Sequence, residues 1–398
     1  MLNEKKEPLW TRSFLKIWLV NFTITIWFFI LIAVFPFYVK HLGGTAMTVG
    51  LAAGGYSLTC ILMRPIAGWF LDNKSRSALL KGGIVGLAVI TIMFVVAPVL
   101  SFAVIMRLVS GFVFSGVSTA SNTNVVDIMP KNRFGEGMAF LGLGNTFASA
   151  IGPALGLLLM ARCGFTLTFI ITAVSLMAAF MAARSLVYKK IERSAGLSAR
   201  NSFKLSILFN AAALPASALV MCSSATFSAV SIFIALYGEF SGLGSGGLFF
   251  MLIALGTGST RLFSGRLTDK KGEFPNLVAG TSGVLTGFLL LLFTNSTCFY
   301  LSALIFGLGF GLINPALQAM AVRIVTPEKR GSASSTYLCA IDIGSGLGGM
   351  AAGWLVTVLG YRPMFGAMVI FVVALWLIYT LWVSKTPAAF RNYIRNHS

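Results

Sequence analysis

The chain has 398 residues, of which 57% are hydrophobic and only 10% are charged, and its mean hydropathy is +0.87. A soluble globular protein of this composition would expose far more apolar surface than its few polar groups could cover. The composition therefore excludes a soluble protein and predicts a membrane protein.

The sequence contains eight uncharged apolar runs that are long enough for a helix to cross roughly 30 Å of hydrocarbon, which takes about 20 residues. Three other apolar stretches are less regular. Residues 108–126 join the preceding run across Arg107, residues 274–322 divide at Asn295 into two spans, and residues 331–361 contain one charge, Asp342. Together they predict an all-α protein with twelve transmembrane helices. The uncharged runs occupy residues 17–39, 42–63, 82–106, 137–161, 163–183, 205–238, 240–260 and 363–384.

The net charge of +19 follows the predicted topology and does not indicate nucleic-acid binding. With a cytoplasmic N-terminus, 26 of the 30 basic residues lie in or beside cytoplasmic segments. Lys40, Arg162 and Arg362 then lie outside, and Arg107 lies within a span. This distribution obeys the positive-inside rule. We expect a multi-pass protein of the cell (inner or plasma) membrane with both termini in the cytoplasm.

The chain contains an internal duplication with an offset of 197 residues. Arg64, Gly68 and Asp72 recur as Arg261, Gly265 and Asp269. Apolar spans coincide with apolar spans at this offset, which predicts two parallel six-helix halves with a site between them. We expect an N-terminal bundle at 1–187, a cytoplasmic linker at 188–203 and a C-terminal bundle at 204–398.

Catalytic and metal-binding patterns are lacking in this sequence. The five cysteines are scattered singly, and neither His41 nor His397 lies near a constellation suited to hydrolysis. We therefore expect no enzyme activity, no cofactor, no metal site and no disulfide framework.

The twelve spans, the parallel halves and a duplicated cytoplasmic motif resemble the major facilitator superfamily over essentially the whole chain. The family motif is Gly-x3-Asp-(Arg/Lys)-x-Gly. The second copy fits it, from Gly265 through Asp269 and Lys270 to Gly272, whereas in the first copy Asn73 replaces the base. The resemblance implies a cytoplasmic gate, with helix capping by the two aspartates as the alternative. Its residues would be Arg64, Gly68, Asp72, Arg261, Gly265, Asp269 and Lys270.

Charged residues near the first copy suggest local partners. Lys74 and Arg76 are placed to supply the missing base. Asp127, on the cytoplasmic side, is a candidate partner for Arg133 or Arg64.

Helix 4 carries Arg107-x3-Gly111, which is similar to a fourth-helix motif that the family uses in proton transfer. An unpaired guanidinium inside a span costs about 2.5–3.5 kcal/mol or more. Arg107 should therefore face a wet cavity or a carboxylate. The alternative is an Arg that bonds backbone carbonyls and holds helices together.

Helix 5 contains Gly152, Pro153 and Gly156, a partial match to the antiporter motif of family exporters. Leu157 stands where a second glycine is usual. The motif implies efflux, whereas an ordinary proline kink is the structural alternative.

Asp342 is a carboxylate eleven residues into an otherwise uncharged span, and the 197 offset pairs it with Asn145. A carboxylate at that depth is costly when ionised, which favours a role in binding a proton or a cationic substrate. The alternative is a protonated Asp in a hydrogen bond between helices.

In the family, the inward faces of helices 1, 4, 7 and 10 line the central site. Each polar or aromatic residue that we assign to these faces is equally well explained as a residue that packs one helix against another. Their mix of neutral polar and aromatic groups suits a moderately amphipathic or anionic small molecule. These candidates are Asn21, Thr25, Trp27, Asn122, Ser223, Thr226, Phe227, Asn314 and Gln318.

The resemblance implies a monomeric secondary transporter that exports a small organic compound or drug by alternating access in exchange for protons. Asp342 and Arg107 would couple transport to protons. One alternative is a proton symporter or facilitator that imports a metabolite. Another, of a different class, is a non-transporting membrane sensor or scaffold.

Overall fold

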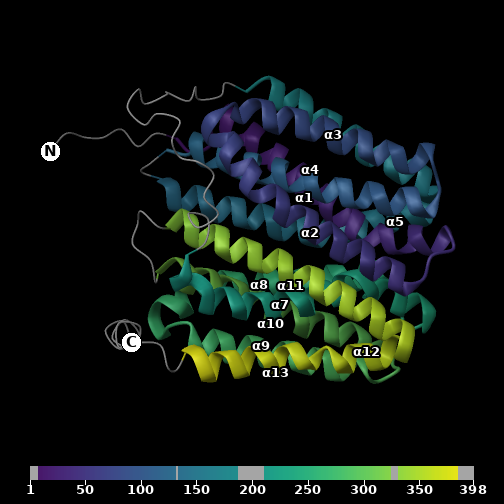
Figure 1. Cartoon of the computed structure of the whole chain (residues 1–398). Coiled ribbons are helices and arrows are strands. Elements are labelled where there is room, and N and C mark those ends of the chain that lie inside the picture. The colour runs from purple at the N-terminus through teal and green to yellow at the C-terminus, as the bar shows by residue number, and fades with distance from the viewer. Residues whose placement is uncertain (1–7, 131–132, 187–209, 324–329, 384–398) are drawn as a thin grey trace. The chain divides into compact units, whose positions relative to one another are not determined.

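The computed structural model describes residues 8–130, 133–186, 210–323 and 330–383, and every regular element in these ranges is helical (Figure 1). The all-α fold class is thereby confirmed. The helices are α1 (Arg12–His41), α2 (Ala46–Asn73), α3 (Arg76–Val96), α4 (Leu100–Ile128), α5 (Phe134–Arg184), α7 (Leu214–Phe240), α8 (Gly246–Lys271), α9 (Phe274–Leu291), α10 (Ser296–Arg323), α11 (Arg330–Leu359), α12 (Tyr361–Ala367) and α13 (Val369–Ile378), with short 3-10 and π segments at Ala211–Ala213 and Tyr379–Val383.

Ten segments of the described residues are long and apolar enough to cross a membrane. One of these, in α5, contains two crossings, because its 51 residues would span about 75 Å as a straight helix. Gly164 interrupts it with φ 73° and ψ 178°, a conformation that glycine adopts without a steric penalty. Dividing α5 adds one crossing to the ten segments. The 26-residue helix α8, which is not among the ten, adds another, so the described helices match the twelve crossings expected from hydropathy.

The predicted run at 82–106 ends earlier in the structure. Helix α3 stops at Val96 and α4 begins at Leu100, so Arg107 lies inside α4, in the fourth span where it was expected. Pro98 lies in this three-residue connection. Proline has no backbone N–H to continue a helix, which explains why the apolar run is divided here.

The chain forms two compact units. The first comprises Met1–Leu31 with Leu62–Phe203, and the second Ile32–Ile61 with Lys204–Ser398. The outer end of α1 and the first half of α2 thus pack with the C-terminal helices. The predicted linker at 188–203 lies outside the described residues, so the boundaries 1–187 and 204–398 stay predictions.

In the first unit, α3 packs against both α4 and α5. The rings of Phe94 and Phe169 join α3 to α5 with centroids 5.3 Å apart. Trp27 of α1 is fully buried, and its Nε1 donates a 2.8 Å hydrogen bond to Thr91 Oγ1 of α3. Aromatic side chains thus join α3 to both α5 and α1 in this unit.

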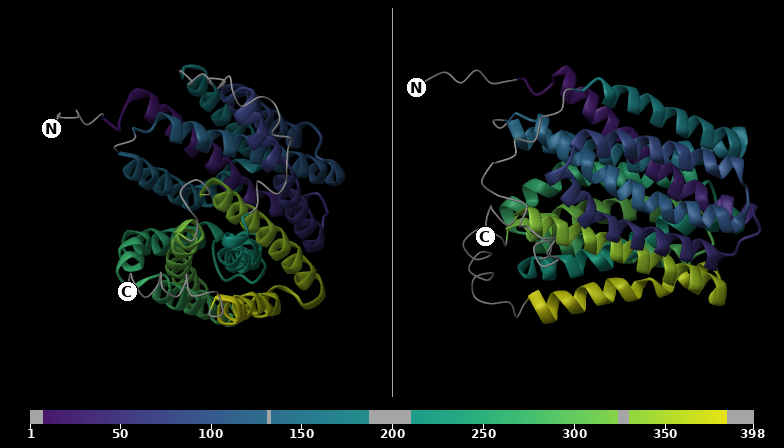
Figure 2. Two further views of the ribbon diagram at one scale, coloured as in Figure 1. Left: turned by 60° about the vertical axis from the view of Figure 1, so that its left-hand side comes forward. Right: turned by 45° about the horizontal axis from the view of Figure 1, so that its top comes forward.

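In the second unit, α7 is the central helix. Figure 2 (left) shows it in teal, nearly end-on, enclosed by green and yellow helices of the same unit. In its most apolar window, 89% of the residues are buried. Helix α11 approaches it very closely, because a Cβ at Gly344 would lie 2.0 Å from Met221 O and one at Gly348 would lie 2.2 Å from Ala225 O. Side chains at these two glycines would force the helices apart.

Candidate substrate and proton sites

A polar network joins α1 to α4 in the first unit. Asn21 of α1 is buried, with 5% of its surface exposed. Its Nδ2 donates to Ser121 Oγ and to Asn122 Oδ1, both at 3.0 Å. Asn21 and Asn122, which the sequence placed on one predicted site, are therefore in direct contact.

The network continues to α5. Thr25 Oγ1 lies 2.8 Å from Asn21 O and 3.5 Å from Asn145 Oδ1. Ser121 and Asn145 were not among the predicted cavity residues. The 197 offset, which pairs Asn145 with Asp342, was the signal that could have identified Asn145.

Asn122 is exposed, and Thr25 and Asn145 are half-buried, although all three lie on membrane-spanning helices. Amide groups in hydrocarbon lose their hydrogen bonds with water, which costs several kcal/mol for each unsatisfied group. This face of the first unit is therefore suited to line a water-filled path. Its groups are neutral donors and acceptors, able to orient a polar substrate without strong charge.

Arg107 is buried in α4, with 4% exposed, and lies seven residues from the start of the helix. Ser110 Oγ donates to its backbone carbonyl at 2.6 Å. Fifteen residues separate it from Asn122, or about 22 Å along the helix. Arg107 therefore lies in the opposite half of the helix from the Asn21 network.

Trp27 has a packing role in the structure. Besides its bond to Thr91, its ring stacks on Phe114 of α4 with centroids 5.9 Å apart. Both contacts are inside the first unit and cover the indole completely. We therefore leave Trp27 out of the substrate path.

The antiporter-like residues of α5 lie where this helix crosses α1. A Cβ at Gly152 would lie 2.6 Å from Phe29 Cβ and 3.3 Å from Ile26 O. Pro153 and Gly156 are buried beside it. The glycine permits a close crossing of the two helices that carry Thr25 and Asn145.

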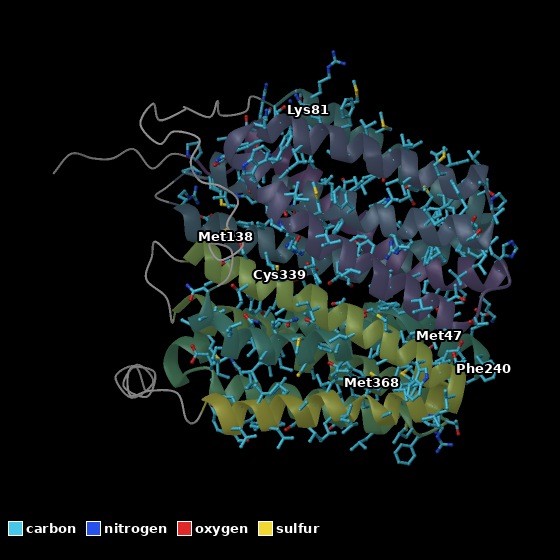
Figure 3. All side chains as sticks on the ribbon, in the orientation of Figure 1. Met47, Lys81, Met138, Phe240, Cys339 and Met368 are labelled. Atoms are coloured by element: carbon cyan, nitrogen blue, oxygen red, sulfur yellow. The ribbon has the colours of Figure 1, made fainter. Side chains whose placement is uncertain are left out.

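Asp342 lies near the middle of α11 in the second unit and is half-buried. Cys339, labelled in Figure 3, marks the same helix three residues earlier. Beyond Asp342, the helix is held to α7 by a 2.7 Å bond from Ser228 Oγ to Ser345 O and by the contacts of Gly344 and Gly348. The carboxylate thus lies on a helix whose backbone is tightly packed.

The other predicted cavity residues of the second unit have different surroundings. Phe227 of α7 makes an edge contact with Phe310 of α10, with centroids 5.0 Å apart. Asn314 is half-buried and its carbonyl accepts a 3.3 Å bond from Tyr337 OH of α11, whereas Gln318 is exposed. Arg261 of α8, in the second gate motif, is half-buried.

Ser223 and Thr226 line a small cavity inside the second unit, among α7, α9, α10 and α13. Both are buried. They face the interior of their own unit, which sequence periodicity alone could not show because α7 carries serine and threonine among its apolar residues with little amphipathic pattern. We therefore leave them out of the substrate path.

Part of the predicted cytoplasmic gate lies outside the described side chains, namely Asp72, Gly265, Asp269 and Lys270. Arg64 and Gly68 are half-buried on α2. These positions stay predictions.

The charges beside the gate pair differently from our expectation. Asp127 forms an ion pair with Arg76 at the start of α3, and Arg133 pairs with Glu136 at 2.7 Å. Asp127 is thus the partner of neither Arg133 nor Arg64 in the structure. That Arg76 supplies the base that the first motif copy lacks stays a prediction.

Comparison with known proteins agrees with this architecture. The family model described as Major Facilitator Superfamily matches residues 17–317 and 277–394. Relatives with known names include the staphylopine export protein of Staphylococcus aureus, 21% identical over 86% of this chain and 90% of that protein. The multidrug resistance protein MdtG of Proteus mirabilis is 25% identical over 95% of this chain and 97% of that protein.

An uncharacterized MFS-type transporter of Methanocaldococcus jannaschii is 24% identical over 94% of this chain and 99% of its own. Among solved structures, the nucleoside transporter NupG has a TM-score of 0.78 with 12% identity, covering 93% of this chain and 100% of that one. Since the family model covers most of the sequence, this chain belongs to the Major Facilitator Superfamily, a family of membrane transporters.

Proposed function

We propose that this protein exports a small organic compound in exchange for protons, by alternating access across the cell membrane. The observation that carries the proposal is Asp342, an ionisable side chain half-buried in the middle of a membrane-spanning helix. A charged Asp at such a depth costs about 2.5–3.5 kcal/mol. Intramembrane carboxylates of this kind mark proton or ion pathways, because taking up a proton removes that cost.

In this proposal, the two units have separate tasks. The neutral face formed by Asn21, Thr25, Asn122 and Asn145 binds and orients the substrate through hydrogen bonds. Asp342 takes up a proton when substrate leaves and releases it when substrate binds. Arg107 assists coupling from the other half of α4.

The direction of transport rests on two supports. Relatives that match this chain over most of their length carry names of export and multidrug-resistance proteins. The close crossing of α1 and α5 at Gly152 is where the antiporter-like motif lies.

We propose further that the substrate is amphipathic or anionic, that the protein is a monomer, and that both of its termini lie in the cytoplasm.

Inside-out membrane vesicles test both direction and coupling. A host that lacks its own efflux pumps is first screened with a panel of drugs and metabolites for a compound whose accumulation falls on expression. In vesicles with an acidified lumen, we expect this compound to accumulate, because lumenal protons leave in exchange for it.

A proton symporter that imports the compound would give the opposite result. It would carry substrate out of the acidified lumen, and no accumulation would occur. A non-transporting sensor or scaffold would move no compound in either direction, and Asp342→Asn would leave its activity intact.

A further inference from the structure

The cavity inside the second unit contains a buried hydroxyl that none of the described groups satisfies. Ser223 of α7 is 4% exposed, and its Oγ has no hydrogen-bond partner among the residues that the structure describes. The cavity beside it leaves about 10 Å³ for the centre of a water-sized molecule. One water requires about this much space.

The other polar lining groups are placed to complete a site for a neutral hydrogen-bonding molecule. Thr226 Oγ1 donates to Ser223 O at 2.7 Å, and Thr281 Oγ1 of α9 donates to Leu277 O at 2.6 Å. Each threonine hydroxyl has thereby used its only hydrogen and keeps lone pairs that can accept. The Ser223 hydroxyl supplies the missing donor.

The other residues that line the cavity are apolar, which disfavours the binding of an ion. Val284, Ile313 and three residues of the last helix, Phe371, Val372 and Leu375, form an apolar wall. An ion would lose its hydration there without an opposite charge among the lining residues. A water molecule can accept from Ser223 and donate to both threonines, which is the usual three bonds of a buried water.

We propose that this cavity is a binding site for one ordered water, which joins α7 to α9 inside the second unit. At about 100° per residue, Ser223 lies on the opposite side of α7 from Met221 and Ala225, whose backbones touch α11. The water thus supports the back of the helix against which the Asp342-bearing helix packs. This site is independent of the substrate and of the direction of transport.

Thermal unfolding of the purified full-length protein tests the water through the sign of a shift. If the hydroxyl binds water, Ser223→Ala lowers Tm by roughly 1–3 °C. If the hydroxyl is unsatisfied, its removal relieves a penalty, and an unchanged or raised Tm would overturn the proposal. Matched controls are Ser217→Ala and Ser231→Ala, which remove buried hydroxyls on the same helix that also lack a partner within the described part of the chain and line no part of this cavity.

A double-mutant cycle tests the bridge itself. Ser223→Ala combined with Thr281→Val should lower Tm by less than the sum of the single changes, because either change already disrupts the shared water. Thr172→Val is the control for the threonine, since Thr172 makes an equivalent 2.6 Å bond to Thr168 O in the other unit. Additive shifts for the Ser223–Thr281 pair would contradict a shared water, as would a map at about 2.5 Å resolution that shows no density beside Ser223 Oγ.

Discussion

Asn145 on α5 and Asp342 on α11 occupy equivalent positions of the duplicated sequence, yet their surroundings differ. Asn145 belongs to an amide and hydroxyl network that extends over α1 and α4, whereas Asp342 lies on a helix whose backbone is packed tightly against α7. At these two equivalent positions, the first unit thus carries a neutral hydrogen-bonding group and the second an ionisable one. In the proposed mechanism, Asn145 contributes to substrate recognition and Asp342 carries the proton.

Exchanging these two side chains should have the largest effect. Asp342→Asn makes the second unit resemble the first and removes the ionisable carboxylate, so we expect transport driven by a pH gradient to fall to background. Exchange of labelled for unlabelled substrate at equal pH should continue, because it needs no net proton movement. The measurement is uptake into proteoliposomes under both conditions.

The reciprocal change, Asn145→Asp, serves as the control for position. It should leave coupling dependent on Asp342 and weaken substrate binding, because a carboxylate replaces a neutral amide in the network. Two results would show that the two units are not specialised as described. One is proton coupling that survives in Asp342→Asn, and the other is proton coupling that is restored when Asn145→Asp is added to Asp342→Asn.

Adding a methyl group where two helices touch should have the next largest effect, which is a loss of stability. We expect a larger loss in the second unit than in the first. Gly348→Ala places a Cβ within 2.2–2.6 Å of Ala225 backbone atoms, which cannot move aside. Overpacking of this kind costs about 1–3 kcal/mol. Gly152→Ala meets Phe29 Cβ at 2.6 Å and should cost less, because this overlap is smaller than the 2.2 Å approach at Gly348 and involves one atom rather than three.

Gly142→Ala is the matched control, since a Cβ there has nothing within 4 Å. It should be neutral or slightly stabilising, because Ala favours a helix over Gly by up to about 1 kcal/mol. Thermal unfolding in detergent ranks the three variants. A larger loss for Gly152→Ala than for Gly348→Ala would reverse the expected order.

Loss of the amide network should have a moderate effect on stability. Asn21→Ala removes two 3.0 Å bonds between α1 and α4. Hydrogen bonds between membrane helices are worth about 0.6 kcal/mol each on average, so we expect a loss of about 1 kcal/mol. Thr23→Ala is the control, because the Thr23 hydroxyl bonds to Leu19 O of its own helix and to nothing else that the structure describes; equal losses would argue against a network between helices.

The smallest effects concern two ion pairs. Arg76–Asp127 in the first unit has side chains 24% and 22% exposed, whereas Lys40–Glu239 in the second, at 3.6 Å, has both 57% exposed. Exposed pairs contribute about 0–1 kcal/mol and are screened by salt. Arg76→Gln should therefore lower Tm more than Lys40→Gln, and the Lys40 effect should vanish at high salt, as measured by unfolding at two salt concentrations.

The sequence predicted the fold well because hydrocarbon imposes a simple rule of length and polarity, which the twelve runs obey. It failed at boundaries where local chemistry decides, as at Pro98, where one apolar run contains the end of α3 and the start of α4. Gly164, by contrast, lies close to the predicted break between the fifth and sixth runs.

Direction of side chains was the harder problem. Asn21 and Asn122 were placed on one site and do contact each other, whereas Trp27 and Ser223 face the interior of their own units. A membrane helix that is apolar on every side has little amphipathic signal to show which face meets water. Asp127 was assigned to Arg133 or Arg64, while its partner Arg76 begins the neighbouring helix, a proximity that only packing of α3 on α4 creates.

The central claim, that substrate and protons move in opposite directions through Asp342, is tested most directly by recording lumenal pH in proteoliposomes while substrate enters down its own gradient. With no initial pH difference, the account predicts that the lumen becomes alkaline in the wild type and stays unchanged in Asp342→Asn. A lumen that becomes acidic, or an alkaline shift that persists in Asp342→Asn, would contradict it.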